Sequence, residues 1–185
     1  MNSTKVSREL WQERMGNLMA RRALGTKGLS VEAERIGDYA AHFKKIFIGK
    51  TVLDVGCGGM GAAKFLTPEI QYTGIDAFPI RPQVIKMEVE QMTFEDQSFE
   101  TLFCFAVLDG VCDLVKAIEQ MKRVCKCNIV FLTGFNIEPD QYHTYKIIES
   151  ELTAKFSPEF EVGYKEYFFP VANPVNVALI EYKRK

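Results

Sequence analysis

The chain has 185 residues, of which 47% are hydrophobic, 12% aromatic and 25% charged, the composition of one ordinary globular domain. Its formal net charge is −1, which excludes a strong overall excess of positive charge for binding polyanions. The cysteines lack the spacing of a zinc site or a disulfide framework, so we expect no metal and a reducing compartment, the cytoplasm. They are Cys57, Cys104, Cys112, Cys125 and Cys127.

The first 50 residues carry ten Lys or Arg against five acids. We interpret this local excess as a solvated helical face, with docking of an anionic substrate as the alternative. The chain begins with the polar stretch MNSTKVSREL, and nowhere approaches the roughly 18 consecutive apolar residues of a membrane span. We therefore expect neither a signal peptide nor a contact with membranes.

Apolar spacing predicts two helices in this basic segment. Ser7 can cap the first, which runs to about Leu24 and ends near Gly25. Ser30 can cap the second, whose buried stripe ends at Phe43.

From residue 50 the pattern changes to short β-branched and apolar runs separated by helical stretches. Buried parallel strands are predicted at Thr51 to Val55, Tyr72 to Ile75, Thr101 to Ala106 and Asn128 to Thr133, with a weaker candidate at Val84 to Glu88. Parallel strands need crossover helices, so this alternation indicates a doubly wound, mostly parallel α/β sheet.

The C-terminal third ends differently. Helices are predicted at Val111 to Val124 and at Gln141 to Lys155. The strands Phe160 to Phe169 and Val175 to Tyr182 then follow with no helix between them, so they should pair antiparallel as a hairpin at one edge of the sheet. We expect a single domain over residues 1–185, with helices in 1–49 and the α/β core in 50–185.

The strongest local signal is VLDVGCGGMG, residues 52–61, in which a strand leads into a glycine-rich turn and then a helix. Gly56, Gly58 and Gly61 satisfy G-x-G-x-x-G, so a dinucleotide-binding domain must be considered. Asp76 ends the next predicted strand, where a carboxylate can accept hydrogen bonds from ribose hydroxyls. Together these features predict a nucleoside cofactor; the alternative is a tight strand-to-helix turn beside a surface acid.

Over residues 46–134 the chain resembles the class I S-adenosylmethionine-dependent methyltransferases. VLDVGCGGMG looks like their first motif, YTGIDAF contains their ribose-binding acid, and FEDQSFETLFCFAVLDGV looks like the stretch around their fourth strand. The resemblance implies a seven-stranded Rossmann-like sheet and S-adenosyl-L-methionine as cofactor. The cofactor-binding residues that it implies are Asp54, Gly56, Cys57, Gly58, Asp76, Ala77, Glu88, Val89, Phe105 and Ala106.

The chain departs from this family pattern in two informative places. Met60 replaces the usual third glycine of the loop, and Gly61 follows it, so the loop could be shifted by one residue. Gly110 stands where the family commonly has a histidine after the fourth strand. This second change weakens assignment to any subfamily whose chemistry uses that histidine.

Acceptor residues can be sought only by position, at the carboxyl edge of the sheet. There His143 and Asp109 are the candidate catalytic residues; the alternatives are a hydrogen-bonded helix residue for His143 and a helix-capping acid for Asp109. His42 is predicted to be structural or exposed, and Cys57 a small buried side chain rather than a nucleophile. The aromatic cluster Tyr164, Tyr167, Phe168 and Phe169 could line an apolar pocket or serve strand packing.

The resemblance leads us to expect a methyltransferase for a small-molecule acceptor, with the N-terminal helices covering the cofactor or shaping the acceptor pocket. Methylation of RNA or protein is the alternative within the same reaction class. A non-catalytic S-adenosylmethionine-binding or regulatory protein is the alternative from another class, because no catalytic motif is visible on the acceptor side. The sequence predicts no oligomeric state.

Overall fold

A seven-stranded sheet forms the centre of the computed structural model, which describes residues 6–23, 42–168 and 176–185. Its strands are β1 (Thr51–Val55), β2 (Gln71–Asp76), β3 (Ile85–Lys86), β4 (Phe99–Phe105), β5 (Cys125–Phe135), β6 (Phe160–Phe168) and β7 (Asn176–Arg184). The α-helices are α1 (Arg8–Ala23), α3 (Leu114–Val124) and α4 (Glu149–Phe156). Short 3₁₀ helices are η1 (Ala62–Phe65), η2 (Val89–Gln91) and η3 (Leu108–Gly110).

The strand order is β3-β2-β1-β4-β5-β7-β6. Strands β1 to β5 pair in parallel, whereas β7 is antiparallel to both β5 and β6. This arrangement confirms the predicted α/β class and the C-terminal hairpin at one edge of the sheet. Most of the predicted second helix, from Ser30 to Phe43, lies outside the described residues.

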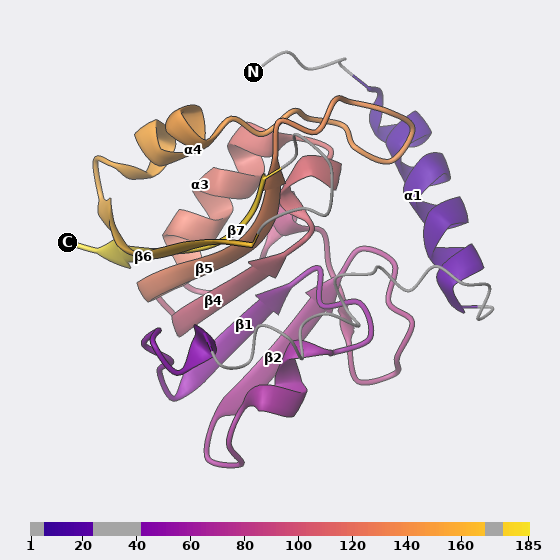
Figure 1. Cartoon of the computed structure of the whole chain (residues 1–185). Helices are drawn as coiled ribbons and strands as arrows, with labels where there is room; N and C mark the ends of the chain where they lie inside the picture. The colour runs from indigo at the N-terminus through magenta and orange to yellow at the C-terminus, as the bar shows by residue number, and fades with distance from the viewer. Residues whose placement is uncertain (1–5, 24–41, 169–175) are drawn as a thin grey trace.

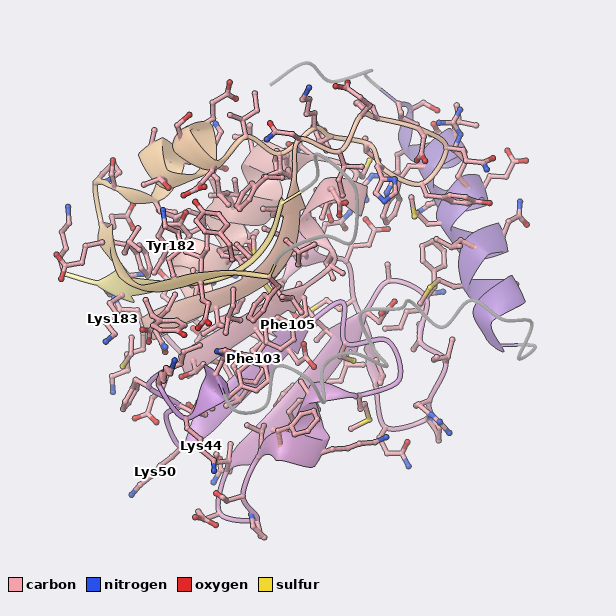
Figure 2. All side chains as sticks on the ribbon, viewed as in Figure 1. Lys44, Lys50, Phe103, Phe105, Tyr182 and Lys183 are labelled. Atoms are coloured by element: carbon pink, nitrogen blue, oxygen red, sulfur yellow. The ribbon has the colours of Figure 1, made fainter. Side chains whose placement is uncertain are left out.

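Two hydrophobic clusters lie on opposite faces of the sheet. The face covered by α3 and α4 buries Phe131, Phe156 and Tyr182 completely or nearly so. On the other face, Phe103 and Phe105 project from β4 and stack with Phe43. Figure 2 shows Tyr182 on the α4 side of the sheet and the two β4 phenylalanines on the opposite side. Burial on both faces explains why the central strands read as continuous apolar runs.

Helix α1 lies apart from this core, beyond the carboxyl ends of the parallel strands (Figure 1). Ser7 caps it as predicted, because its Oγ accepts a hydrogen bond of 3.2 Å from the Leu10 amide. The segment that follows β5 reaches out to the same side (Figure 1). The carboxyl edge of the sheet is thus flanked by the N-terminal helix and by the segment between β5 and α4.

Three predicted helices are shorter in the structure. The glycine loop leads only into the 3₁₀ turn η1, since Pro68 follows closely and disfavours helical backbone before it. Helix α3 begins at Leu114 rather than Val111, because Asp113 is its N-cap and accepts from the Lys116 amide at 3.1 Å. The prediction of a helix from residue 141 is wrong, as α4 begins at Glu149.

The chain from 141 to 148 fails to form a helix because its backbone groups bond elsewhere. The Asp140 carboxylate accepts from the amides of Tyr142 and His143, which competes with helical pairing. The Tyr145 amide donates to the carbonyl oxygen of Asp109, and the carbonyl oxygen of Ile147 accepts from the amide of Asn136, which directly follows β5. His143 therefore lies in a loop that is tied to two neighbouring segments.

Candidate functional site

A cavity of about 710 Å³ opens at the carboxyl edge of the sheet. This volume is within the range of roughly 300–1,000 Å³ that is usual for small-molecule sites. Every residue predicted to bind cofactor or to catalyse lines it. They are Asp54, Gly56, Cys57, Gly58, Asp76, Ala77, Glu88, Val89, Phe105, Ala106, Asp109 and His143.

The glycine loop after β1 forms one wall with an unusual backbone. Gly56 has φ of 65°, and a Cβ there would collide with the Val107 side chain. Gly58 has φ of 49°, and a Cβ there would meet nothing within 4 Å. Met60 has φ of 63°, whereas Gly61 has the helical φ of −60°. The conformation that favours glycine therefore falls on position 60, where the family has its third glycine, and not one residue later.

Asp76 faces this loop from the end of β2. Its Oδ2 accepts a hydrogen bond from the Gly58 amide at 3.0 Å, and its Oδ1 accepts one from the Phe78 amide at 2.8 Å. A carboxylate offers about four lone-pair sites, so each oxygen can accept a further hydrogen bond from a ligand. The contact fixes the acid against the loop while leaving acceptor capacity toward the cavity.

Asp54 lies at the bottom of the cavity and is 3% exposed. Burial raises the pKa of its carboxyl to about 7, assisted by the negative charge of Asp76 and opposed by a hydrogen bond of 2.6 Å from the Tyr72 hydroxyl. Burial, with the same two acids, also raises the pKa of the Cys57 thiol to about 12. Cys57 is therefore a poor thiolate, as expected of a small buried side chain.

Glu88, which follows β3, joins the cavity to α1. Its carboxylate forms an ion pair with Arg8 and accepts a hydrogen bond of 3.2 Å from Gln12. The adjacent Val89 is buried and begins η2. Sequence reasoning placed Glu88 in the site but missed Arg8, which carries no recognisable motif.

Helix α1 covers the cavity with one apolar face. Trp11 is 5% exposed, donates its indole N–H to the Gly110 carbonyl oxygen at 2.6 Å, and packs against Phe78 with ring centroids 5.7 Å apart. Further along the helix, the lining residues are Met15, Leu18 and Met19. Their helical spacing was visible in the sequence, but the surface that they face was not.

The candidate catalytic residues His143 and Asp109 come together. The His143 Nε2 lies 3.7 Å from an Asp109 carboxylate oxygen, and its Nδ1 lies 2.9 Å from the Asp140 Oδ1. Partial burial by itself would raise the pKa of Asp140. Hydrogen bonds from the amides of Tyr142 and His143 and from the imidazole outweigh this effect and lower the pKa, so Asp140 stays ionised at neutral pH. The sequence assigned no role to Asp140 or to Tyr142, which also lines the cavity.

The aromatic cluster of β6 is not part of this cavity. Tyr164 and Phe168 pack against the cluster around Phe103, which confirms the strand-packing interpretation for these two. Tyr167 is 37% exposed, and Phe169 lies outside the described residues. His42 is also remote from the cavity lining, beside Glu166 and the Phe168 ring.

Residues 53–132 match the family model described as a methyltransferase domain. The matched range contains the glycine loop, Asp76, Glu88 and strand β4, which are the elements that build the cavity. The central part of the chain is therefore similar to the methyltransferase family. This confirms the family that the motifs indicated, and members of it use S-adenosylmethionine.

Individual relatives agree with this assignment. A ubiquinone biosynthesis O-methyltransferase of Alkalilimnicola ehrlichii is 28% identical over 151 residues, which cover 72% of this chain and 60% of that protein. The structure resembles 1,6-didemethyltoxoflavin-N1-methyltransferase of Burkholderia thailandensis, with a TM-score of 0.73 and 13% identity over 100% of this chain and 93% of that one. That structure holds 1,6-didemethyltoxoflavin and S-adenosylhomocysteine.

A third similar structure is magnesium protoporphyrin IX methyltransferase from Synechocystis with bound S-adenosylmethionine. Its TM-score is 0.65 at 14% identity, over 95% of this chain and 94% of that one. At such low identities the two structures establish the fold of this methyltransferase domain and not its acceptor. Among the described helices, none has the length and apolar character needed to cross a bilayer.

Proposed function

We propose that this protein is an S-adenosylmethionine-dependent methyltransferase that acts on a small-molecule acceptor. The observation that carries the proposal is the hydrogen bond between the Gly58 amide and Asp76 at the cavity wall. This bond holds the carboxylate that we assign to ribose binding against a turn whose open Cβ positions at Gly58 and Gly59 leave room for a ligand. These residues suit an adenosine-bearing cofactor.

We assign the cofactor contacts along the wall formed by β1, β2 and β3. Asp76 would accept from the ribose hydroxyls, Glu88 and the Val89 amide would bind the adenine, and Asp54 would face the methionine ammonium. Phe105 and Ala106 would line the methionyl side. When bound, S-adenosylmethionine supplies an electrophilic methyl group on a sulfonium sulfur. The protein then has to align a nucleophile at about 3 Å from that carbon.

A small acceptor is supported over RNA by the distribution of charge. None of the described basic side chains of residues 1–50 lines the cavity. Lys44 and Lys50 lie near the amino end of β1, opposite the glycine loop (Figure 2). Arg8 is paired with Glu88. The described part of the basic segment therefore supplies no continuous path of positive charge into the site.

We further propose that the protein works in the cytoplasm, as one domain over residues 1–185. All five cysteines are free in the structure, which suits a reducing compartment. The cavity is walled by residues from α1 through to β7, which suits a single domain.

Calorimetric titration with S-adenosylhomocysteine tests the cofactor assignment. The wild-type chain is expected to bind it, and Asp76→Ala to bind it at least tenfold more weakly, because hydrogen bonds to a charged group contribute about 1.5–3 kcal/mol. Asp96→Ala is the matched control, since this acid pairs with Arg123 and does not line the cavity. Equal affinity of wild type and Asp76→Ala, or no heat with wild type, would refute the proposal.

A further inference from the structure

The cavity has two chemically different halves. The half formed by loops after β1, β2 and β3 holds most of the proposed cofactor residues and the cations Lys64 and Arg81, while Phe105 and Ala106 lie at the border with the other half. Among its described lining residues, the half formed by β4, β5 and β7 has one acid, Asp109, one histidine, His143, and one tyrosine, Tyr142. The rest of this second half is largely apolar. Its apolar lining residues include Val107, Val111, Leu132, Ile137 and Val177.

The imidazole of His143 is held in one orientation within this second half. Asp140 Oδ1 lies 2.9 Å from Nδ1 and is itself fixed by the amides of Tyr142 and His143, each at 2.7 Å. An ionised carboxylate at Nδ1 accepts its proton, so the basic lone pair is on Nε2. Nε2 faces Asp109 at 3.7 Å, beyond direct hydrogen-bond distance.

A third polar group in this half lacks a partner. Thr133 of β5 lines the cavity and is 2% exposed, and its hydroxyl has no hydrogen-bond partner in the part of the chain that the structure describes. A buried hydroxyl left unpaired costs about 1–3 kcal/mol. A polar group on a ligand would satisfy it.

We infer that His143 Nε2 is the general base for a neutral phenolic acceptor bound in the half of the cavity formed by β4, β5 and β7. This inference rests on the proposed methyltransferase function and names its substrate class. The apolar wall favours an uncharged ring, since a buried ammonium would pay a large desolvation cost. A carboxylate-bearing acceptor would be repelled by Asp109 and Asp140. Imidazole can accept a proton from a phenol more readily than from an aliphatic alcohol. The pKa of a phenol is far closer to that of imidazole than the pKa of an aliphatic alcohol is.

The reaction balances with the residues present. The phenol proton passes to His143 Nε2, and the O–H electron pair stays on oxygen. That oxygen forms the new bond to the methyl carbon, while the carbon–sulfur pair remains with the donor sulfur. Asp109 stabilises the imidazolium by its charge at 3.7 Å, and the proton leaves to solvent with product release.

The first test reads ionisation and not turnover. Protein saturated with S-adenosylhomocysteine is mixed with 4-nitrophenol at a pH where the free phenol is mostly neutral, and phenolate absorbance is recorded. Wild type is expected to bind the probe and increase the phenolate signal. His143→Gln is expected to bind it without that increase. The control is His42→Gln, which replaces the other histidine, outside the cavity lining.

The second test follows transfer of labelled methyl groups to matched panels of small phenols, aromatic amines and aromatic thiols. We expect transfer to phenols, a loss of about 10²–10⁴-fold in kcat for His143→Gln, and partial recovery at high pH where the phenol ionises unaided. Asp140→Asn removes the negative charge beside Nδ1. This variant should have a lower kcat and an altered pH dependence of the rate under the conditions used for wild type, while its KM changes little. His42→Gln should match wild type in both tests.

The outcomes separate the two proposals. If S-adenosylhomocysteine does not bind, the proposed function fails and this inference fails with it. If it binds but 4-nitrophenol stays neutral or unbound, the assignment of His143 and of the phenolic acceptor is overturned alone. Transfer only to amines or thiols, or to none of the panels, also overturns it.

Discussion

The indole N–H of Trp11 donates a 2.6 Å hydrogen bond to the carbonyl oxygen of Gly110, and so joins α1 to the turn that follows β4. The two residues are 99 positions apart in the chain. Gly110 stands where the resemblance expected a histidine. In this protein that position contributes a backbone acceptor, and the histidine that lines the cavity comes from the loop after β5 instead.

Replacing Trp11 by Phe should destabilise the protein by about 1 kcal/mol, because the half-buried carbonyl group of Gly110 loses its donor while ring packing on Phe78 is partly kept. Urea unfolding followed by circular dichroism measures the loss. Leu10→Ala is the control on the same helix, since Leu10 is 39% exposed and should change stability by no more than about 0.5 kcal/mol. Equal effects of the two changes would contradict the role given to the hydrogen bond.

Trp11 is the one tryptophan of the chain, and it lines the cavity. Its fluorescence should therefore respond when S-adenosylhomocysteine binds, with a midpoint that agrees with calorimetry. Asp76→Ala should shift this midpoint to higher concentration. A fluorescence that stays constant while calorimetry reports binding would show that α1 does not contact the ligand region.

Met60→Gly should stabilise the protein by about 1 kcal/mol. Met60 adopts φ of 63°, a left-handed conformation that costs a residue with a Cβ roughly 1–2 kcal/mol, and the greater chain entropy of glycine offsets part of the gain. Gly61→Ala is the matched control. Because Gly61 has helical backbone, alanine there should be neutral or stabilising. Destabilisation by Met60→Gly in chemical unfolding would contradict this account of the loop.

Asp54 should make stability depend on pH in an unusual direction for an acid. Burial raises its pKa to about 7 in the folded chain, well above the value of about 4 expected when unfolded. The folded state therefore binds the extra proton, and this contribution to stability is complete below pH of about 4 and is lost as the pH rises through about 7. Asp54→Asn should remove that decline, on the order of a few kcal/mol, between pH 5 and 8.

The free energy of unfolding from urea titrations at several pH values checks this prediction. Tyr72→Phe is the companion variant, because the Tyr72 hydroxyl lowers the pKa of Asp54. Its loss should move the decline to higher pH. Parallel pH profiles for wild type and Asp54→Asn would show that the carboxyl is ionised in the folded chain.

Sequence patterns predicted the sheet well because its strands are buried on both faces, and β1 has the predicted limits, Thr51–Val55. Helix limits were less predictable where side chains redirect the backbone, as Asp140 does before α4. The cavity-lining residues at strand ends and in the glycine turn were predictable because these positions have recognisable chemistry, whereas those of α1 were not. The pairing of His143 with Asp109 depends on two loops meeting in space, and no local pattern encodes that.

Glu88 holds Arg8 and Gln12 of α1 while it lines the cavity. A ligand that binds to the Glu88 carboxylate must change the stability of the contact between Glu88 and the N-terminal helix. By thermodynamic reciprocity, the stability of that contact changes the affinity for the ligand. Ligand binding and docking of α1 are thus thermodynamically linked.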